Sequence, residues 1–229
     1  MNKQELTVEN QPVLIIDDLF ANTTCSDWLN FYTDTSFKLS ACEKHAPGFW
    51  NFVRGLELFD VENIFGMSKI VLPLLHEWNE KHGTNFKYTD MHRAHVNLIK
   101  HGDKFTGHVD YDHNDDVCKG LVFLWFGNPF FEDLGGGFYL GENEKYYVEN
   151  NFNRCVMFPA ELWHKIEEVK CPESIRLTVY MGFRKDDSKI RTRQYSQTSM
   201  KNVFNRDTTR YKEINEQLSK DYGVVINYG

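Results

Sequence analysis

The sequence predicts an α+β fold with a mainly β core, in which helices precede and follow the strands. Short apolar runs, broken by Gly, Asp and Asn, succeed one another through the centre of the chain. Many short strands at regular spacing are typical of a sandwich or barrel. A length of 229 residues suits a single domain. We expect a helix-rich N-terminal support over about 1–87, the β core over about 88–184 and a C-terminal extension over about 185–229.

Strands are expected where apolar or alternating runs end at turn residues. In the N-terminal support these are Pro12–Ile16 and, less regularly, Phe49–Phe59. In the core they are Tyr88–Ile99, Phe105–Tyr111, Gly120–Trp125, Gly137–Leu140, Tyr146–Val148, Cys155–Phe158, Lys165–Val169 and Arg176–Phe183.

Helices are expected on both sides of this core. A threonine can cap a helix over residues 23–31. The pattern of Val61–His82 is also helical, although Pro73 should kink or divide it, and Gly83 is a plausible stop. The C-terminal extension contains a charged helix over Arg210–Tyr222 with a narrow apolar stripe.

Charge and composition argue against several partners. The net charge is −7, and the densest basic stretch, Arg184–Arg193, is diluted by two aspartates, so nucleic acid is not expected. No apolar run approaches the roughly 20 residues needed to span a membrane. The polar segment Met1–Gln11 lacks the apolar stretch of a signal peptide. The five cysteines are irregularly spaced, which predicts no disulfide framework and favours the reducing cytoplasm.

The candidate metal site begins in the expected strand Phe105–Tyr111. Side chains alternate between the faces of a strand, so His108 and Asp110 point the same way and can grip one cation. The pair alone is a common chance pattern, but His164 follows a later strand and a Pro-containing turn. Two histidines and one carboxylate on one face of a metal leave coordination positions open, which is typical of non-haem Fe(II) oxygenases.

The order of these pieces resembles the 2-oxoglutarate–Fe(II) oxygenase superfamily, in particular its prolyl 4-hydroxylase-like branch. The matching stretches are Asn97 through Gly102-Asp103 to His108-Val109-Asp110, Gly135-Gly136-Gly137-Phe138, Phe158-Pro159 with Trp163-His164, and Arg176-Leu177-Thr178-Val179-Tyr180. The opening Val13–Phe20 also resembles that branch, so the similarity extends to about residue 184. The tail after Lys189 is not explained by it.

The resemblance implies a double-stranded β-helix, a jelly-roll of two facing sheets, with helices bracing one side. It implies Fe(II) held by His108, Asp110 and His164, with no catalytic residue needed beyond these ligands. It also implies 2-oxoglutarate and O₂ as co-substrates, and ascorbate as a reductant. The oligomeric state is left open.

Arg176 is the implied anchor for the far carboxylate of 2-oxoglutarate, because a guanidinium forms a bidentate pair and stays charged. Thr178 lies on the same strand face and can donate a hydrogen bond to that carboxylate. Tyr180 shares this face, without an assigned role. Lys165 and Lys170 are weaker rivals for the anchoring role.

One position departs from the family pattern. Many relatives carry a tyrosine that contacts the co-substrate where this chain has Ile99. Asn97 lies on the same strand face as Arg93 and His95, which makes this face unusually polar. We expect the face to line the barrel lumen and Asn97 to help bind the co-substrate.

The expected activity is hydroxylation of an unactivated C–H bond, coupled to decarboxylation of 2-oxoglutarate to succinate. The resemblance favours a peptidyl proline in a protein or peptide as the substrate. Arg93 and Tyr111 are candidate substrate contacts, and Trp163 is a candidate wall of the pocket. The alternatives are the same chemistry on a small molecule or nucleobase, and a non-catalytic cupin-like metal-binding protein.

Overall fold

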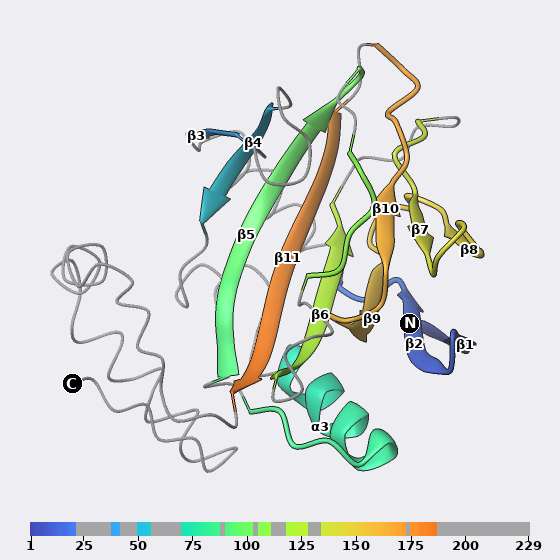
Figure 1. Cartoon of the computed structure of the whole chain (residues 1–229), viewed down its shortest axis with the longest axis vertical. Coiled ribbons are helices and arrows are strands. Elements are labelled where there is room, and N and C mark those ends of the chain that lie inside the picture. The colour runs from blue at the N-terminus through green and yellow to red at the C-terminus, as the bar shows by residue number, and fades with distance from the viewer. Residues whose placement is uncertain are drawn as a thin grey trace, which may run out of the picture.

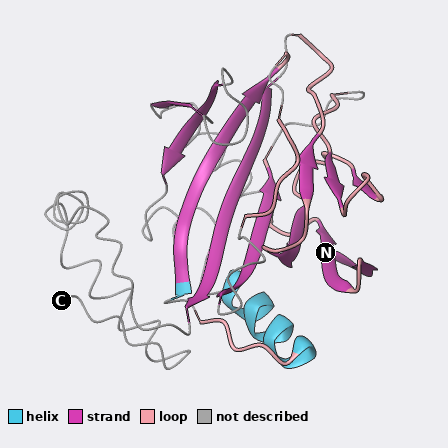
Figure 2. Cartoon of the chain, viewed as in Figure 1, coloured by secondary structure: helices cyan, strands magenta, loops and turns pink. Residues whose placement is uncertain are grey.

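The computed structural model describes residues 1–21, 38–41, 50–55, 70–87, 90–102, 105–110, 118–127, 134–172 and 175–186. Strands make up most of this part, and α3 (Val71–His82) is the only α-helix within it (Figure 1, Figure 2). The strands are β1 (Asn2–Val8), β2 (Gln11–Asp17), β3 (Lys38–Ala41), β4 (Trp50–Gly55), β5 (Met91–Lys100), β6 (Cys118–Phe126), β7 (Phe138–Leu140), β8 (Tyr146–Val148), β9 (Cys155–Pro159), β10 (His164–Ile166) and β11 (Ile175–Asp186).

The strands form two sheets, and every pairing within the described residues is antiparallel. The larger sheet has the order β1-β2-β9-β6-β11-β5-β4-β3, and the smaller has the order β10-β7-β8. One apolar cluster joins Phe138 and Leu140 of the smaller sheet to Leu124 and Val156 of the larger. Two sheets packed over a shared core confirm the predicted mainly β jelly-roll (Figure 1).

The opposite face of the larger sheet is covered by α3. Leu72 and Trp78 of the helix belong to the same apolar cluster as Phe123 of β6 and Met157 of β9. Because both faces of β6 are covered, Leu121–Phe126 is buried at every position instead of alternating. The helix therefore braces the sheet from the side away from the inter-sheet core.

Within the described residues, the helix expected over Val61–His82 begins only at Val71. Pro73 is its third residue, where a backbone N–H would have no acceptor within the helix, so the proline is tolerated there. Gly83 ends α3 as predicted, with a left-handed φ of 63° and its N–H bonded to the carbonyl of Asn79. Within the described part of the chain, no helix combines the length and apolar character that crossing a membrane requires.

Some expected elements differ or lie elsewhere. Among residues 105–110, the expected strand is reduced to an isolated bridge at His108. The edge strand β1 was not predicted, because its residues are mostly polar and exposed. The expected helix over 23–31, the first part of the helix expected from Val61, and the charged helix over 210–222 lie outside the described residues.

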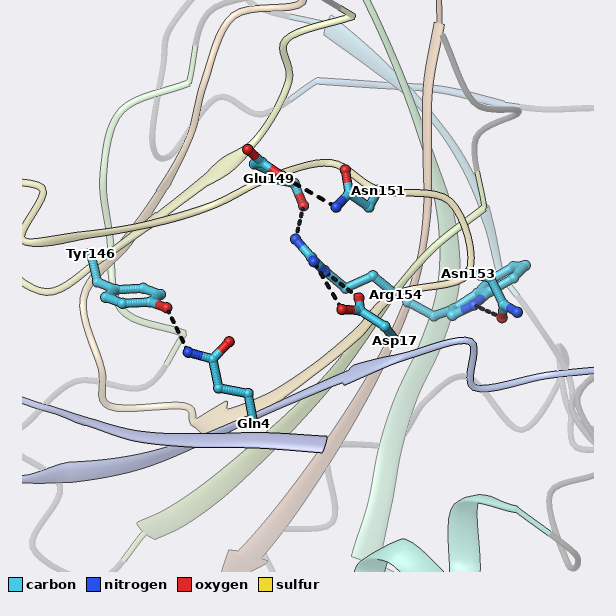
Figure 3. A network of polar contacts seen from close by, with 8 residues as sticks. Gln4, Asp17, Tyr146, Glu149, Asn151, Asn153 and Arg154 are labelled. Carbon is cyan, nitrogen blue, oxygen red and sulfur yellow. Dashed lines mark hydrogen bonds and ion pairs between the residues drawn. The ribbon is translucent and has the colours of Figure 1, made fainter. Parts of the chain in front are cut away.

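A buried amide holds the segment after β2 against the core. The side chain of Asn153 accepts hydrogen bonds from the Phe20 N–H (3.0 Å) and the Trp125 indole (3.2 Å), and donates to the Phe20 carbonyl (2.8 Å). The adjacent Arg154 forms a two-point ion pair with Asp17 at the end of β2, at 2.6 and 3.1 Å (Figure 3). These contacts tie the N-terminal hairpin to the loop before β9.

Candidate metal and co-substrate site

Backbone hydrogen bonds bring the three predicted metal ligands together. His108 and His164 exchange N–H···O bonds of 2.9 Å in both directions, which places them directly opposite each other at the start of β10. The N–H of Asp110 bonds instead to the carbonyl of Ala160, in the turn that precedes β10. Residues 105–110 therefore add a short, interrupted edge to the smaller sheet. The side chains of His108 and Asp110 still point toward the same place.

The three side chains converge closely enough to hold one ion. One ligand atom from each of His108, Asp110 and His164 lies within 4.8 Å of the others. Asp110 Oδ1 is 3.6 Å from His108 Nε2 and 3.9 Å from His164 Nε2. His164 is buried, with its ring against Phe138 and Phe158, so its position is set by packing. Oδ1 thus faces both ring nitrogens that a metal would use.

The other nitrogen of each ring faces a carbonyl. His108 Nδ1 lies 3.2 Å from the oxygen of Thr106, and His164 Nδ1 lies 3.0 Å from the oxygen of Leu162. A carbonyl only accepts, so in each neutral ring Nδ1 carries the proton and Nε2 presents its lone pair toward Asp110. Such bonds are the usual way in which proteins orient histidine ligands.

The charges at the site favour a bound cation. Burial raises the pKa of Asp110, but hydrogen bonds and the histidine charges outweigh it and lower the pKa to about 2. Burial lowers the pKa of His108, yet the negative charge of Asp110, to which the protonated ring can donate, shifts the net pKa upward. Asp110 is therefore ionised at neutral pH and attracts positive charge to the shared space.

Arg176 is buried without an anionic partner in the described chain. It is 1% exposed; its Nε donates to the Gly136 carbonyl at 2.6 Å and its Nη1 donates to Thr178 Oγ1 at 3.3 Å. Within the described residues, Nη2 has no hydrogen-bond partner. One face of the guanidinium lies against the Phe126 ring, 5.2 Å from its centroid. Burial lowers the pKa of Arg176 to about 9, so the group is still charged at neutral pH.

The two rival lysines are already paired with carboxylates. Lys165 Nζ lies 2.5 Å from Glu144, and Lys170 Nζ lies 3.0 Å from Glu167. Both side chains are substantially exposed, so water also solvates their charges. Burial without a counter-charge distinguishes Arg176 from both, and it is therefore the better anchor for a ligand carboxylate.

The register of β5 and β11 places the polar residues on one face. Thr178 pairs with Asn97, so the two side chains point to the same side of the sheet as Arg176. Thr178 also pairs with Phe126, whose side chain belongs to the inter-sheet core. The part of the expected polar face formed by His95 and Asn97 thus lies inside the barrel. Ile99, opposite Arg176, is buried in an apolar cluster, so it adds no polar group.

Three further residues complete the predicted set. Trp163 is half-buried, and its indole packs so tightly on Gly107 that a Cβ at Gly107 would lie 1.7 Å from the ring. The tryptophan is therefore a fixed wall beside His108 and His164. Tyr111 and the side chain of Arg93 lie outside the described residues.

Sequence reasoning missed a contact of Tyr180. Its hydroxyl donates to Asp110 Oδ2 at 3.1 Å, from the same strand face as Arg176. Strand alternation placed Tyr180 on this face, but only the fold brings β11 to Asp110.

No protein-family profile and no curated protein sequence matches the chain. Solved structures do match its fold. A Pseudomonas putida prolyl-4-hydroxylase is 14% identical, with 76% of this chain and 92% of that chain covered and a TM-score of 0.58. A Trichoplax adhaerens prolyl hydroxylase, solved with a fragment of hypoxia-inducible factor, is 18% identical, with 75% and 82% covered and a TM-score of 0.59.

A third match has a different activity. The non-haem α-ketoglutarate-dependent epimerase SnoN from nogalamycin biosynthesis is 9% identical, with 76% of this chain and 77% of that chain covered and a TM-score of 0.52. α-Ketoglutarate is another name for 2-oxoglutarate. At these identities the similarity concerns the fold. The chain has the double-stranded β-helix fold shared by 2-oxoglutarate–Fe(II) oxygenases, including those of the prolyl 4-hydroxylase-like branch.

Proposed function

We propose that this protein is a 2-oxoglutarate- and Fe(II)-dependent dioxygenase that hydroxylates an unactivated C–H bond. The observation that carries the proposal is the buried Arg176, whose Nη2 has no partner in the described chain and which faces the same lumen as the His108–Asp110–His164 cluster. A buried charge without a counter-ion is costly unless a ligand supplies one. A carboxylate ligand that reaches both Arg176 and a metal is a simple explanation for the pairing.

The donor set fits Fe(II). Two imidazole nitrogens and one carboxylate oxygen suit this metal and leave room for exogenous oxygen ligands. When bound, Fe(II) would allow O₂, the oxidant, to react with 2-oxoglutarate and the substrate: one oxygen atom would enter succinate as CO₂ is lost, and the other would enter the C–H bond.

The protein's own residues orient the metal ligands and the co-substrate and keep water away from one side of His164. The Thr106 and Leu162 carbonyls fix the two imidazoles, while Phe138 and Phe158 exclude water from one side of His164. Arg176 and Thr178 offer two donors to a ligand carboxylate, and Asn97 lies next to them with an amide. No general base is required of the protein.

We propose a peptidyl proline as the substrate. The support is the similarity to two prolyl hydroxylases, one of them solved with a peptide fragment. The fixed, half-buried indole of Trp163 offers a flat apolar surface of the kind on which a proline ring packs. A small-molecule substrate is the alternative, supported by the similarity to the SnoN epimerase from nogalamycin biosynthesis.

The test is succinate release by the purified protein with Fe(II), ascorbate and 2-oxoglutarate, alone and with proline-rich peptides. We expect release that proline peptides stimulate, and a peptide product with one added oxygen atom. His108→Ala should abolish turnover and metal binding. His76→Ala is the matched control, because His76 is an exposed histidine on α3.

Two results would contradict the proposal. Metal binding without any turnover of 2-oxoglutarate would favour a cupin-like binding protein. Turnover that small molecules stimulate and proline peptides do not would retain the oxygenase but reject the peptidyl substrate.

A further inference from the structure

We propose that Tyr180 is a positioning residue for the metal site: it holds Asp110 so that only one carboxylate oxygen is free to bind the metal. The inference rests on the proposed metal ligands. It begins from the hydrogen bond that the Tyr180 hydroxyl donates to Asp110 Oδ2, at 3.1 Å. Asp110 Oδ1, in contrast, lies 3.6 and 3.9 Å from the two histidine Nε2 atoms. The two oxygens of one carboxylate therefore have different surroundings.

This difference determines how many coordination positions Asp110 can occupy. A free carboxylate binds a cation through one oxygen or through both. A hydrogen bond to Oδ2 stabilises negative charge on that oxygen and directs it away from the ion. Asp110 then contributes Oδ1 alone. The proposed chemistry requires Asp110 to bind through one oxygen, because each coordination position that Asp110 leaves unused is open to exogenous ligands.

The tyrosine ring is itself held in place. Tyr180 pairs with His95 across β11 and β5, and the two rings stack with centroids 4.8 Å apart and planes inclined by 28°. His95 is buried, at 6% exposure. The stack restricts rotation of the tyrosine ring and so keeps its hydroxyl within reach of Asp110.

The arrangement also couples the two ends of the site through one strand. Arg176, Thr178 and Tyr180 project from the same face of β11, and the strand rise puts the first and last Cα atoms about 13 Å apart. Arg176, the buried positive charge, is thus at one end of this row, and Tyr180, which orients Asp110, is at the other. A single rigid strand fixes the anchor and the metal ligand relative to each other.

The test compares Mn²⁺ affinity of the full chain, as a stand-in for Fe(II), in the wild type, Tyr180→Phe and Tyr147→Phe. Tyr147 is the matched control, because its hydroxyl also donates to a carboxylate, Glu167, at 2.6 Å, but away from the metal ligands. We expect Tyr180→Phe to weaken Mn²⁺ binding about 10- to 100-fold, the usual effect of removing an outer hydrogen bond to a ligand. Tyr147→Phe should bind Mn²⁺ as the wild type does.

A spectroscopic measurement separates positioning from a general loss of structure. Freeing Oδ2 allows Asp110 to bind through both oxygens, so the Co²⁺ absorption spectrum of Tyr180→Phe should change in band position and intensity. The Tyr147→Phe spectrum should match the wild type. If Tyr180→Phe does not fold, His95→Leu replaces it; that variant keeps the hydroxyl but removes the stacked ring, and we expect a smaller weakening of Mn²⁺ binding.

The outcomes distinguish this inference from the proposed function. If the wild type binds Mn²⁺ and His108→Ala does not, while Tyr180→Phe binds with unchanged affinity and an unchanged Co²⁺ spectrum, the positioning role is wrong and the metal site stands. If His108→Ala binds Mn²⁺ as tightly as the wild type, the ligand assignment fails and the positioning role fails with it.

Discussion

Asn153 and Arg176, two of the buried polar residues in the described part of the chain, differ in charge and in how completely the protein satisfies their hydrogen bonds. Asn153, at 4% exposure, has both side-chain polar atoms hydrogen bonded to Phe20 and Trp125. Arg176, at 1% exposure, keeps Nη2 without a partner in the described residues. The first group is neutral and satisfied within the protein. The second is charged and incompletely satisfied.

The difference separates a structural role from a binding role. A buried polar group that the fold itself satisfies adds stability and specifies one arrangement of the chain. A buried charge that the fold leaves incomplete lowers stability until a ligand arrives. Asn153 should therefore matter for folding and not for ligand binding, whereas Arg176 should show the reverse. Four substitutions test this contrast.

The largest expected effect on stability comes from Asn153→Ala. The change removes the hydrogen bonds that the Asn153 side chain makes with the Phe20 N–H, the Phe20 carbonyl and the Trp125 indole, and each lost bond is worth roughly 0.5–1.5 kcal/mol. It also places alanine at a left-handed φ of 61°. We expect the free energy of unfolding, measured in urea, to fall by about 3–4 kcal/mol. Asn151→Ala is a control at a half-buried amide, whose side chain donates to the exposed Glu149 at 3.3 Å, and it should lower the free energy of unfolding by less than about 1 kcal/mol. A small loss in Asn153→Ala would reject the structural role.

Arg176→Met should weaken 2-oxoglutarate binding, whereas Asn153→Ala should lower stability. Removing the buried charge offsets the lost bond to Gly136, so the free energy of unfolding should stay within about 1 kcal/mol of the wild type or rise. Affinity for 2-oxoglutarate, measured by calorimetry with Mn²⁺ bound, should fall at least roughly 30-fold, as expected for about 2 kcal/mol or more. Arg154→Met is the control arginine, and it should retain 2-oxoglutarate binding. Severe destabilisation of Arg176→Met with normal binding would reverse the comparison.

Strand alternation explains why Arg176 could be predicted from the sequence and Asn153 could not. Along β11, a period of two is enough to put Arg176, Thr178 and Tyr180 on one face, and the order of motifs suggested the metal ligands. Asn153 lies in a loop, where an asparagine is typical of any turn, so nothing in its neighbourhood indicated a buried role.

Other features depend on long-range pairing that no local pattern encodes. The register that sets Asn97 opposite Thr178 joins strands far apart in the sequence. The bond from Tyr180 to Asp110 also requires β11 to lie close to residues 105–110. The missing partner of Arg176 Nη2 is a property of the packed interior, which a sequence does not display. Ile99 was noticed as a departure, and its burial shows that an apolar contact occupies the place next to the arginine.

Gly136→Ala should moderately lower both the free energy of unfolding and the affinity for 2-oxoglutarate. Gly136 has a φ of 67°, and a Cβ there would lie 3.0 Å from Arg176 Cδ and 3.2 Å from Val169 Cγ2. We expect a loss of about 1–2 kcal/mol in the free energy of unfolding, since the backbone strain alone costs that much, and weaker 2-oxoglutarate binding because Arg176 must shift. Gly83→Ala is a matched control: its φ is 63°, but nothing lies within 4 Å of the added Cβ. Equal effects of both variants on 2-oxoglutarate affinity would show that crowding of Arg176 is unimportant.

The smallest expected effect belongs to Arg154→Lys, beside Asn153. The guanidinium contacts both oxygens of Asp17 and the Glu149 carbonyl, and a lysine cannot reproduce this fork (Figure 3). Asp17 is 37% exposed at its side chain, so solvent weakens the pair, and we expect a loss of only about 0.5–1 kcal/mol. Urea unfolding at low and high salt measures it, and the difference from the wild type should shrink at high salt. A loss as large as that of Asn153→Ala would mean that the ion pair, and not the buried amide, holds the N-terminal hairpin in place.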